Sequence, residues 1–144
     1  MIEKDTVKLL RECDAGVEMG IKSIDDVLDS VKSAELRECL RECREAHERL
    51  RGEIKEKLED CHDDGKEPSA VARTMSWIKT NVKLGVHDSD HTVADLMTDG
   101  CNMGVKSLNR YLNQYEAADE YSKDIAKRLI NLEEKLAVDI RKYL

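Results

Sequence analysis

The 144-residue chain has the length of one domain, and its composition favours long helices. Charged residues make up 38% of it and aromatic residues 3%, with one proline and no phenylalanine, so aliphatic side chains supply most of the packing. The net charge of −7 repels phosphate backbones and argues against a nucleic-acid partner. No apolar run approaches the roughly 20 residues that a membrane span requires.

Residues 4–61 carry two apolar stripes of helical period and predict a first hairpin. The stripe of the helix expected at 4–31 consists of Leu10, Cys13, Val17, Ile21, Ile24, Leu28 and Val31. The stripe of the helix expected at 34–61 consists of Leu36, Leu40, Cys43, His47, Leu50, Ile54, Leu58 and Cys61. Ser33 is the expected N-cap between them, so the turn is short and the helices are antiparallel neighbours.

Residues 90–144 predict a second hairpin, with helices expected at 90–114 and 119–143. A crossover of residues 62–89 joins the hairpins, and its stretch SAVARTMSWIKTNVKL predicts a short additional helix. The whole chain, 1–144, is therefore predicted to be a single all-α domain, an antiparallel four-helix bundle made of two hairpins.

The two predicted hairpins repeat each other in sequence. Residues 19–28, MGIKSIDDVL, align with residues 103–112, MGVKSLNRYL. Residues 47–58 align with residues 133–144 at nearly the same offset. This self-similarity indicates a duplicated helical hairpin.

Two glycines recur at aligned positions of the first and third predicted helices, Gly16 and Gly20 as Gly100 and Gly104. A glycine inside a helix costs about 1 kcal/mol relative to alanine, so its recurrence indicates a geometric need. The expected need is a close approach of the first and third helices near a pseudo-twofold axis. Two independent flexible kinks are the alternative.

Two helical hairpins joined by a long crossover resemble the ferritin-like superfamily. Three segments carry a closer similarity: CDAGVEMG in the first helix, RECREAHERLRGEI in the second, and MSWIK in the crossover. On these segments the chain is similar to a bacterial family of ferritin-like four-helix bundles of unknown function. Members of the superfamily often dimerise, so the resemblance allows a homodimer.

The resemblance predicts four candidate metal ligands: Glu18, His47, Asn102 and Glu133. In ferritin-like di-iron proteins the first and third helices each supply a glutamate, and the other two each supply a Glu-x-x-His pair. Glu18 and His47 lie about equally far from the first turn, so antiparallel helices bring them to one depth. Asn102 and Glu133 straddle the second turn likewise, and all four are expected to meet near mid-bundle.

The expected partner of Glu133 is His47, because each lies on the apolar stripe of its helix. A buried carboxylate without a partner would be expensive. The ligand set nevertheless departs from a di-iron centre, since Arg44 stands where a glutamate should precede the histidine and Leu136 stands where the second histidine is required. The three remaining interpretations are a buried polar cluster without metal, one metal ion, and two metal ions, with iron, manganese and zinc as candidates.

The cysteines form a second constellation. Cys39, Cys43 and His47 follow one another along one helical ridge, with Cys13 and Cys101 able to face the same interior. Thiolates with imidazole would suit Cu(I) or Zn(II), whereas buried cysteines also serve simply as small hydrophobes. The odd count, without the dense spacing of a disulfide scaffold, favours reduced thiols in the cytoplasm, as does the lack of a secretory signal at the start.

Three functions remain open at this point. The broken ligand set favours a ferritin-like bundle that has lost its di-iron site and acts as a non-catalytic interaction or stress-associated protein with a protein partner. The first alternative is a metal-binding or redox protein with Glu18, His47 and Glu133 as ligands and Asn102 as a weak ligand. The second is thiol-based metal storage. No catalytic residue is predicted.

Overall fold

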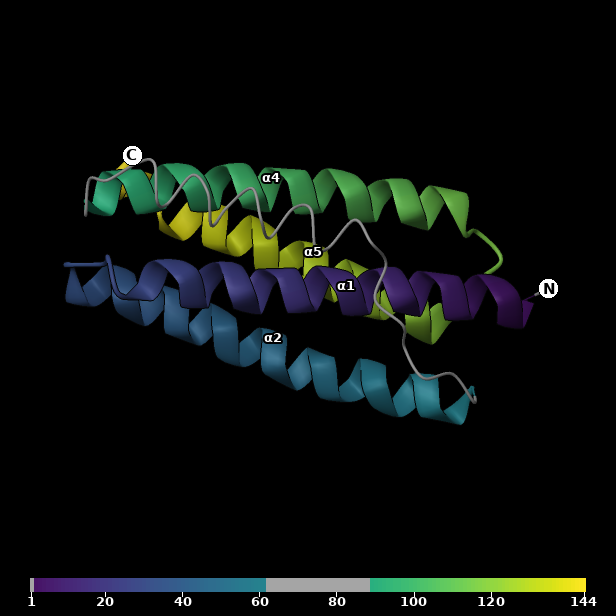
Figure 1. The fold of residues 1–144 in the computed structure, drawn as a ribbon. Coiled ribbons are helices and arrows are strands. Elements are labelled where there is room, and N and C mark those ends of the chain that lie inside the picture. The colour runs from purple at the N-terminus through teal and green to yellow at the C-terminus, as the bar shows by residue number, and fades with distance from the viewer. Residues whose placement is uncertain (1, 62–88) are drawn as a thin grey trace.

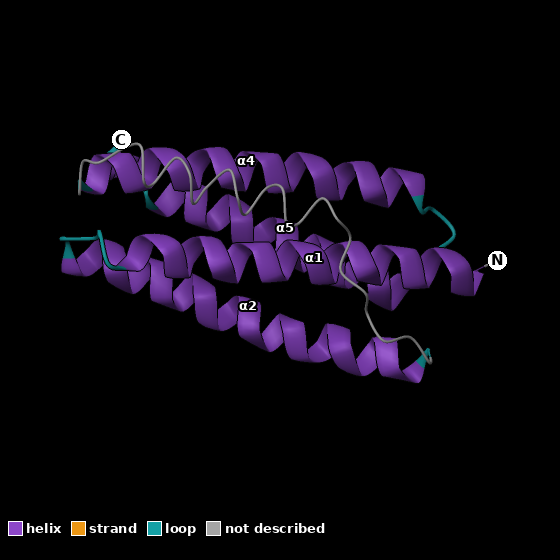
Figure 2. Ribbon diagram, viewed as in Figure 1, coloured by secondary structure: helices purple, strands orange, loops and turns teal. Residues whose placement is uncertain are grey.

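The computed structural model describes residues 2–61 and 89–144, which form long helices and no strand (Figures 1 and 2). The elements are α1 (Ile2–Leu28), α2 (Ala34–Asp60), α4 (Asp90–Gln114), α5 (Glu120–Asp139) and a 3-10 turn, η1 (Arg141–Tyr143). The four predicted long helices are confirmed, although the last one ends earlier than expected and tightens into η1. The short helix predicted in the crossover falls in residues 62–88, outside the described residues.

The helices form a four-helix bundle in which α1 packs beside α2 and α4 beside α5 (Figure 1). The two pairs meet through contacts of α1 with α4 and α5 and of α2 with α5. Capping side chains set where the helices begin: the Ser33 hydroxyl accepts a hydrogen bond from the Leu36 N–H (3.2 Å), and Ser89 accepts one from Thr92 (3.1 Å). The predicted N-cap at Ser33 is therefore confirmed.

Two apolar clusters fill the interior, one at each end of the bundle. The first cluster contains Leu9, Leu10, Cys13, Val17, Ile21, Leu50, Ile54, Leu58, Leu108, Ala118, Ile125, Ala126, Leu129 and Ile130. The second cluster contains Ile24, Val27, Val31, Leu36, Leu40, Cys43, Val93, Ala94, Met97, Cys101, Leu136 and Ile140. Along each of the four long helices, the buried residues belong first to one cluster and then to the other, and the change takes place within about two turns. That boundary is where the candidate site lies.

The first helix of each pair is hydrogen-bonded to the turn that joins the two helices of the other pair. We call these two sets of bonds the reciprocal clamps. At the start of α4, the Asp90 carboxylate accepts hydrogen bonds from the backbone N–H of Lys32 (2.8 Å) and of Ser33 (3.0 Å), in the turn between α1 and α2. At the start of α1, the Asp5 carboxylate accepts one from the N–H of Ala117 (3.0 Å), in the turn between α4 and α5. Ionised acceptors make these bonds stronger than neutral ones.

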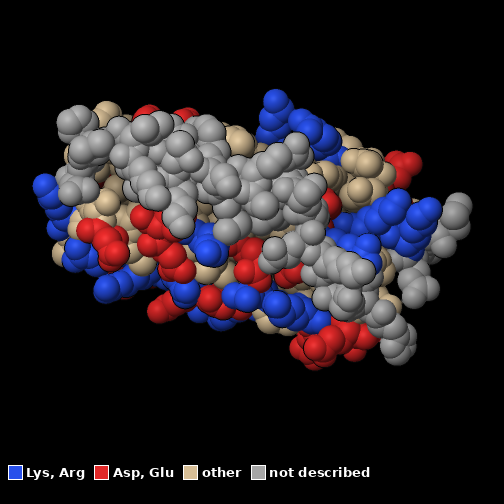
Figure 3. Space-filling model, in the orientation of Figure 1, with Lys and Arg blue, Asp and Glu red and all other residues tan. Residues whose placement is uncertain are grey.

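The visible surface carries acidic and basic side chains side by side (Figure 3). Several of them pair across helices, as Arg128 does with Glu53 (2.8 Å) and Lys142 with Glu35 (2.7 Å). Exposed pairs of this kind contribute at most about 1 kcal/mol each, so the interior supplies most of the stability. None of the described helices combines the length and the apolar character needed to cross a membrane.

Candidate functional site

The boundary between the two apolar clusters holds a buried histidine and a buried glutamate. His47 on α2 is 2% exposed and Glu133 on α5 is 7% exposed. The imidazole Nε2 lies 3.7 Å from the carboxylate Oε1, which is close enough for an ion pair and too long for a good hydrogen bond. The prediction that His47 is the partner of Glu133 is confirmed.

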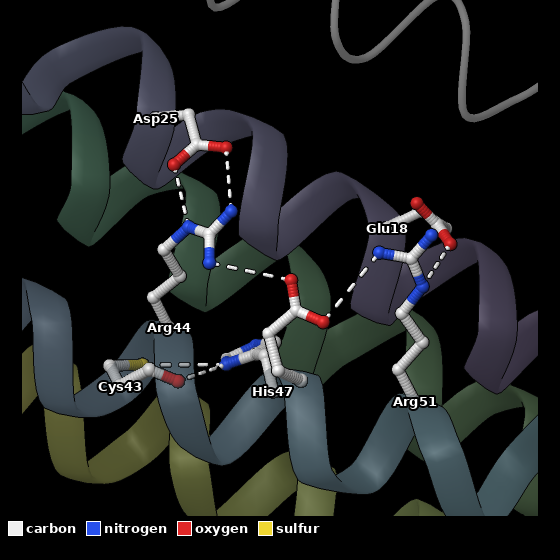
Figure 4. A network of polar contacts seen from close by, with 7 residues as sticks. Glu18, Asp25, Cys43, Arg44, His47 and Arg51 are labelled. Carbon is white, nitrogen blue, oxygen red and sulfur yellow. Dashed lines mark hydrogen bonds and ion pairs between the residues drawn. The ribbon is translucent and has the colours of Figure 1, made fainter.

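The other ring nitrogen of His47 fixes the orientation of the imidazole. Nδ1 lies 2.8 Å from the backbone carbonyl oxygen of Cys43, one turn earlier on α2, and 3.6 Å from the Cys43 sulfur (Figure 4). Because a carbonyl oxygen can only accept, Nδ1 carries a proton and donates it. Nε2 has no hydrogen-bond partner and is turned toward Glu133.

Two glycines make room for this pair. A Cβ built on Gly20 of α1 would lie 2.6 Å from Nε2 of His47, and one built on Gly104 of α4 would lie 3.0 Å from Oε2 of Glu133. Each glycine therefore accommodates a side chain from the other helix of its own pair. The predicted need, a close approach of the first and third helices, is wrong for these two positions: the atoms that would clash belong to His47 and Glu133.

The charge state of the pair follows from its surroundings. Burial alone would lower the pKa of His47, but its contacts with Cys43 and Glu133 outweigh burial and raise the pKa to about 10. The imidazole is therefore protonated at neutral pH and balances the carboxylate. A neutral pair of this kind avoids the large cost of an uncompensated charge in the core.

Two buried thiols, Cys101 near the pair and Cys13 in the first cluster, are held in their protonated form. Burial and the nearby Glu133 carboxylate raise the pKa of Cys101 far above its ordinary value. Burial, together with Glu12 and Asp14, raises the pKa of Cys13 to about 12. Since the thiolate is the nucleophile and the usual metal ligand, these thiols are poor candidates for either role at neutral pH.

We expect the bundle to lose stability as the pH rises above 7, and we expect His47 to account for part of the loss. Its pKa of about 10 exceeds the ordinary value of 6.5, so the folded state binds this proton more tightly than the unfolded state. The resulting stabilisation is fully present below about pH 6.5 and is lost as the pH passes through about 10, with a slope of at most about 1.4 kcal/mol per pH unit.

Urea unfolding at pH 7.0, 7.5 and 8.0, below most thiol ionisation in the unfolded chain, measures this slope. The matched control is the double variant His47→Leu/Glu133→Leu, which removes the titrating pair and keeps Cys13 and Cys101. A double variant with the same slope as the unsubstituted chain would refute the assignment to His47.

A small cavity adjoins the pair. Its volume is about 20 Å³, which is room for roughly one water molecule. His47, Glu133, Cys43 and Cys101 line it, together with methionines from α1 and α4. A space of this size holds a single small ligand and excludes an organic substrate, so the centre offers no ordinary active-site pocket.

Glu18, predicted to join His47, lies instead on the seam between α1 and α2. Its carboxylate is 2.8 Å from Nε of Arg51, and its side chain is 18% exposed. It belongs to a row of ion pairs that continues through Glu48 and Arg44 to Asp25 (Figure 4). The arginine neutralises Glu18, so its expected role beside His47 is wrong.

Asn102, also predicted to lie inside, is exposed on α4. Its neighbour Cys101 is buried, and a step of one residue turns the side chain about 100° around the helix. Equal distances from a turn place residues at one height along the bundle without setting the direction in which they point. The expectation that four residues share one centre is therefore corrected: His47 and Glu133 meet inside, and Glu18 and Asn102 lie elsewhere.

Iron and manganese prefer several carboxylate and imidazole ligands, and the boundary between the two apolar clusters supplies one of each, Glu133 and His47. Within residues 2–61 and 89–144, no group of three or more His, Cys, Asp or Glu side chains is placed to hold a metal ion. The residues present therefore do not fit the ligand set that the ferritin-like resemblance implies.

Comparisons of the chain with protein-family models, with curated proteins and with solved structures found no match.

Proposed function

We propose that this chain is an antiparallel ferritin-like bundle, built from two hairpins joined by the crossover 62–89, that acts as a non-catalytic interaction or stress-associated protein of the cytoplasm. The observation that carries the proposal is the self-neutralising pair of His47 and Glu133 in the place of a metal centre. A protein that uses its interior only for support acts through its surface. Its partner is a second copy of the chain or another protein.

The electrostatics of the centre support this proposal over di-iron chemistry. Two divalent cations bound beside His47 would meet one carboxylate there, that of Glu133, and would displace the proton of His47. Most of their charge would then remain uncompensated in the core. The other candidate carboxylate, Glu18, is already engaged by Arg51.

The alternatives each retain some support. A metal-binding or redox protein with one iron, manganese or zinc ion would use His47 and Glu133, the only two of the four predicted ligands that the described interior contains. Thiol-based metal storage would use Cys39 and Cys43 beside His47, joined by Cys13 and Cys101. Burial raises the pKa of the Cys13, Cys39 and Cys101 thiols and works against that function.

Titration of the purified, reduced chain with Fe(II), Mn(II) and Zn(II) under exclusion of oxygen tests the proposal. We expect no ion to bind stoichiometrically at micromolar concentration, and no difference between the unsubstituted chain and His47→Leu. Binding of one or two equivalents that His47→Leu abolishes would overturn the proposal in favour of a metal protein. Sedimentation equilibrium over a range of concentrations then separates self-association from a requirement for another protein.

A further inference from the structure

Five sulfur-bearing residues line the cavity beside the His47–Glu133 pair. Met19 of α1 and Met97 and Met103 of α4 line it, and so do Cys43 of α2 and Cys101 of α4. The chain has five methionines and five cysteines in all, so half of its sulfur-bearing residues border one water-sized space.

An unpartnered nitrogen faces the same space. His47 lines the cavity, is 2% exposed, and has no hydrogen-bond partner at Nε2. Its Nδ1 donates to the Cys43 carbonyl, so Nε2 is the ring nitrogen that can coordinate an ion, once the ion has displaced the Nε2 proton. Next to it, the Glu133 carboxylate supplies one negative charge. A nitrogen donor, neutral thioethers and a single balancing charge therefore surround one small cavity.

We propose that this cavity binds one soft monovalent cation, Cu(I) or Ag(I), through Nε2 of His47 and the thioether sulfurs of Met19 and Met97. Thioethers and thiols select soft ions, and imidazole is a good ligand for copper, whereas hard ions need oxygen ligands. Binding displaces the Nε2 proton of the His47 imidazolium to solvent, and the single positive charge of the ion takes its place opposite the Glu133 carboxylate, so the occupied centre remains neutral. A divalent ion would not be balanced in this way.

The dimensions of the cavity agree with this ligand. A volume of about 20 Å³ accepts one bare cation and excludes a hydrated one, so the donors must replace the water shell. Met103 lines the cavity while 45% of its surface is exposed, which gives an ion a sulfur-lined route inward. Thioethers bind without losing a proton, so the protonated state of Cys101 is no obstacle.

The site shares the His47–Glu133 pair with the proposed function but is separate from the di-iron ligand scheme, and one bound Cu(I) would add to the proposed surface role without making the protein catalytic. The described residues contain no metal-binding group of three His, Cys, Asp or Glu side chains, and the site proposed here depends on methionine instead. Failure to bind Cu(I) would leave the proposed function intact. Stoichiometric binding of Fe(II) would overturn that function without bearing on this site.

The test is an anaerobic titration of the reduced 144-residue chain with Cu(I) delivered by a coloured chelator of known affinity, repeated with Ag(I) by native mass spectrometry. We expect one equivalent to bind more tightly than any further ions. Met19→Leu and Met97→Leu conserve volume and should fold, because such exchanges typically cost less than about 1.5 kcal/mol. Each should weaken binding at least tenfold, and the double variant should weaken it further.

The matched controls are Cys39→Ala and Cys61→Ala, which remove thiols that do not line the cavity. They should leave the first equivalent unchanged, and X-ray absorption should show both nitrogen and sulfur neighbours around copper. Loss of the first equivalent in these controls, or its retention in Met19→Leu/Met97→Leu, would refute the site, as would failure of the unsubstituted chain to compete with the chelator.

Discussion

His47→Leu should lower the free energy of unfolding by about 3–5 kcal/mol, the usual effect of removing one member of a buried ion pair. The substitution leaves the Glu133 carboxylate 7% exposed, without the one cationic partner that it has among the described residues. The adjoining cavity has room for about one water molecule, which cannot supply the positive charge of the lost imidazolium. Urea unfolding at pH 7, followed by circular dichroism at 222 nm, measures the loss.

The double variant His47→Leu/Glu133→Leu separates charge from packing. It removes both members of the pair, and exchanging a buried ion pair for apolar residues is often neutral or stabilising. We therefore expect its stability to lie within about 1 kcal/mol of the unsubstituted chain. If the double variant is as unstable as His47→Leu alone, lost packing rather than an unpaired carboxylate explains the effect.

Gly20→Ala should destabilise the bundle by about 1–3 kcal/mol, the usual penalty for overpacking a core. This is contrary to helix propensity, which favours alanine over glycine by about 1 kcal/mol. The added Cβ would lie 2.6 Å from Nε2 and 2.7 Å from Cδ2 of His47. The ring cannot swing away cheaply, since it is buried and its Nδ1 is bonded to the Cys43 carbonyl.

Gly52→Ala is the matched control for this substitution. Gly52 lies inside α2, is exposed, and has no atom within 4 Å of the position of an added Cβ. Alanine there should raise stability by about 0.5–1 kcal/mol. The interpretation also requires that His47→Ala relieve the added cost of Gly20→Ala in a double-variant cycle. If Gly20→Ala stabilised the bundle as Gly52→Ala does, the steric argument would be wrong.

Apolar periodicity was sufficient to predict the four helices and the inward position of His47 and Glu133. Both residues interrupt an apolar stripe, and a buried carboxylate needs a partner at the same height. The prediction that Glu18 and Asn102 also lie inside was wrong. The distance of a residue from a turn sets its height along the helix but not the direction in which its side chain points around the helix axis. Glu18 follows the buried Val17 by one residue and so points to the seam between α1 and α2, where Arg51 meets it.

The role of the glycines could be predicted only in part. Their recurrence indicated a steric requirement, but the atoms requiring the space became known only when α1 was placed against α2 and α4 against α5. A stronger signal was present beside them, since methionine precedes glycine both at Met19–Gly20 and at Met103–Gly104. Both methionines border the cavity at the pair, which an aligned pattern of sulfur and glycine could have indicated.

The reciprocal clamps limit how the two helical pairs can slide along each other. A shift by one helical turn, about 5.4 Å, would break the bonds of Asp90 at one end of the bundle and those of Asp5 at the other end together. Thr6 adds to the resistance, because its hydroxyl accepts a hydrogen bond from the backbone N–H of Asp119 (2.8 Å). The hydrogen bonds at the two ends of the bundle thus prevent the helical pairs from sliding past each other. They thereby keep His47 on α2 at the same height as Glu133 on α5, although neither residue takes part in these bonds.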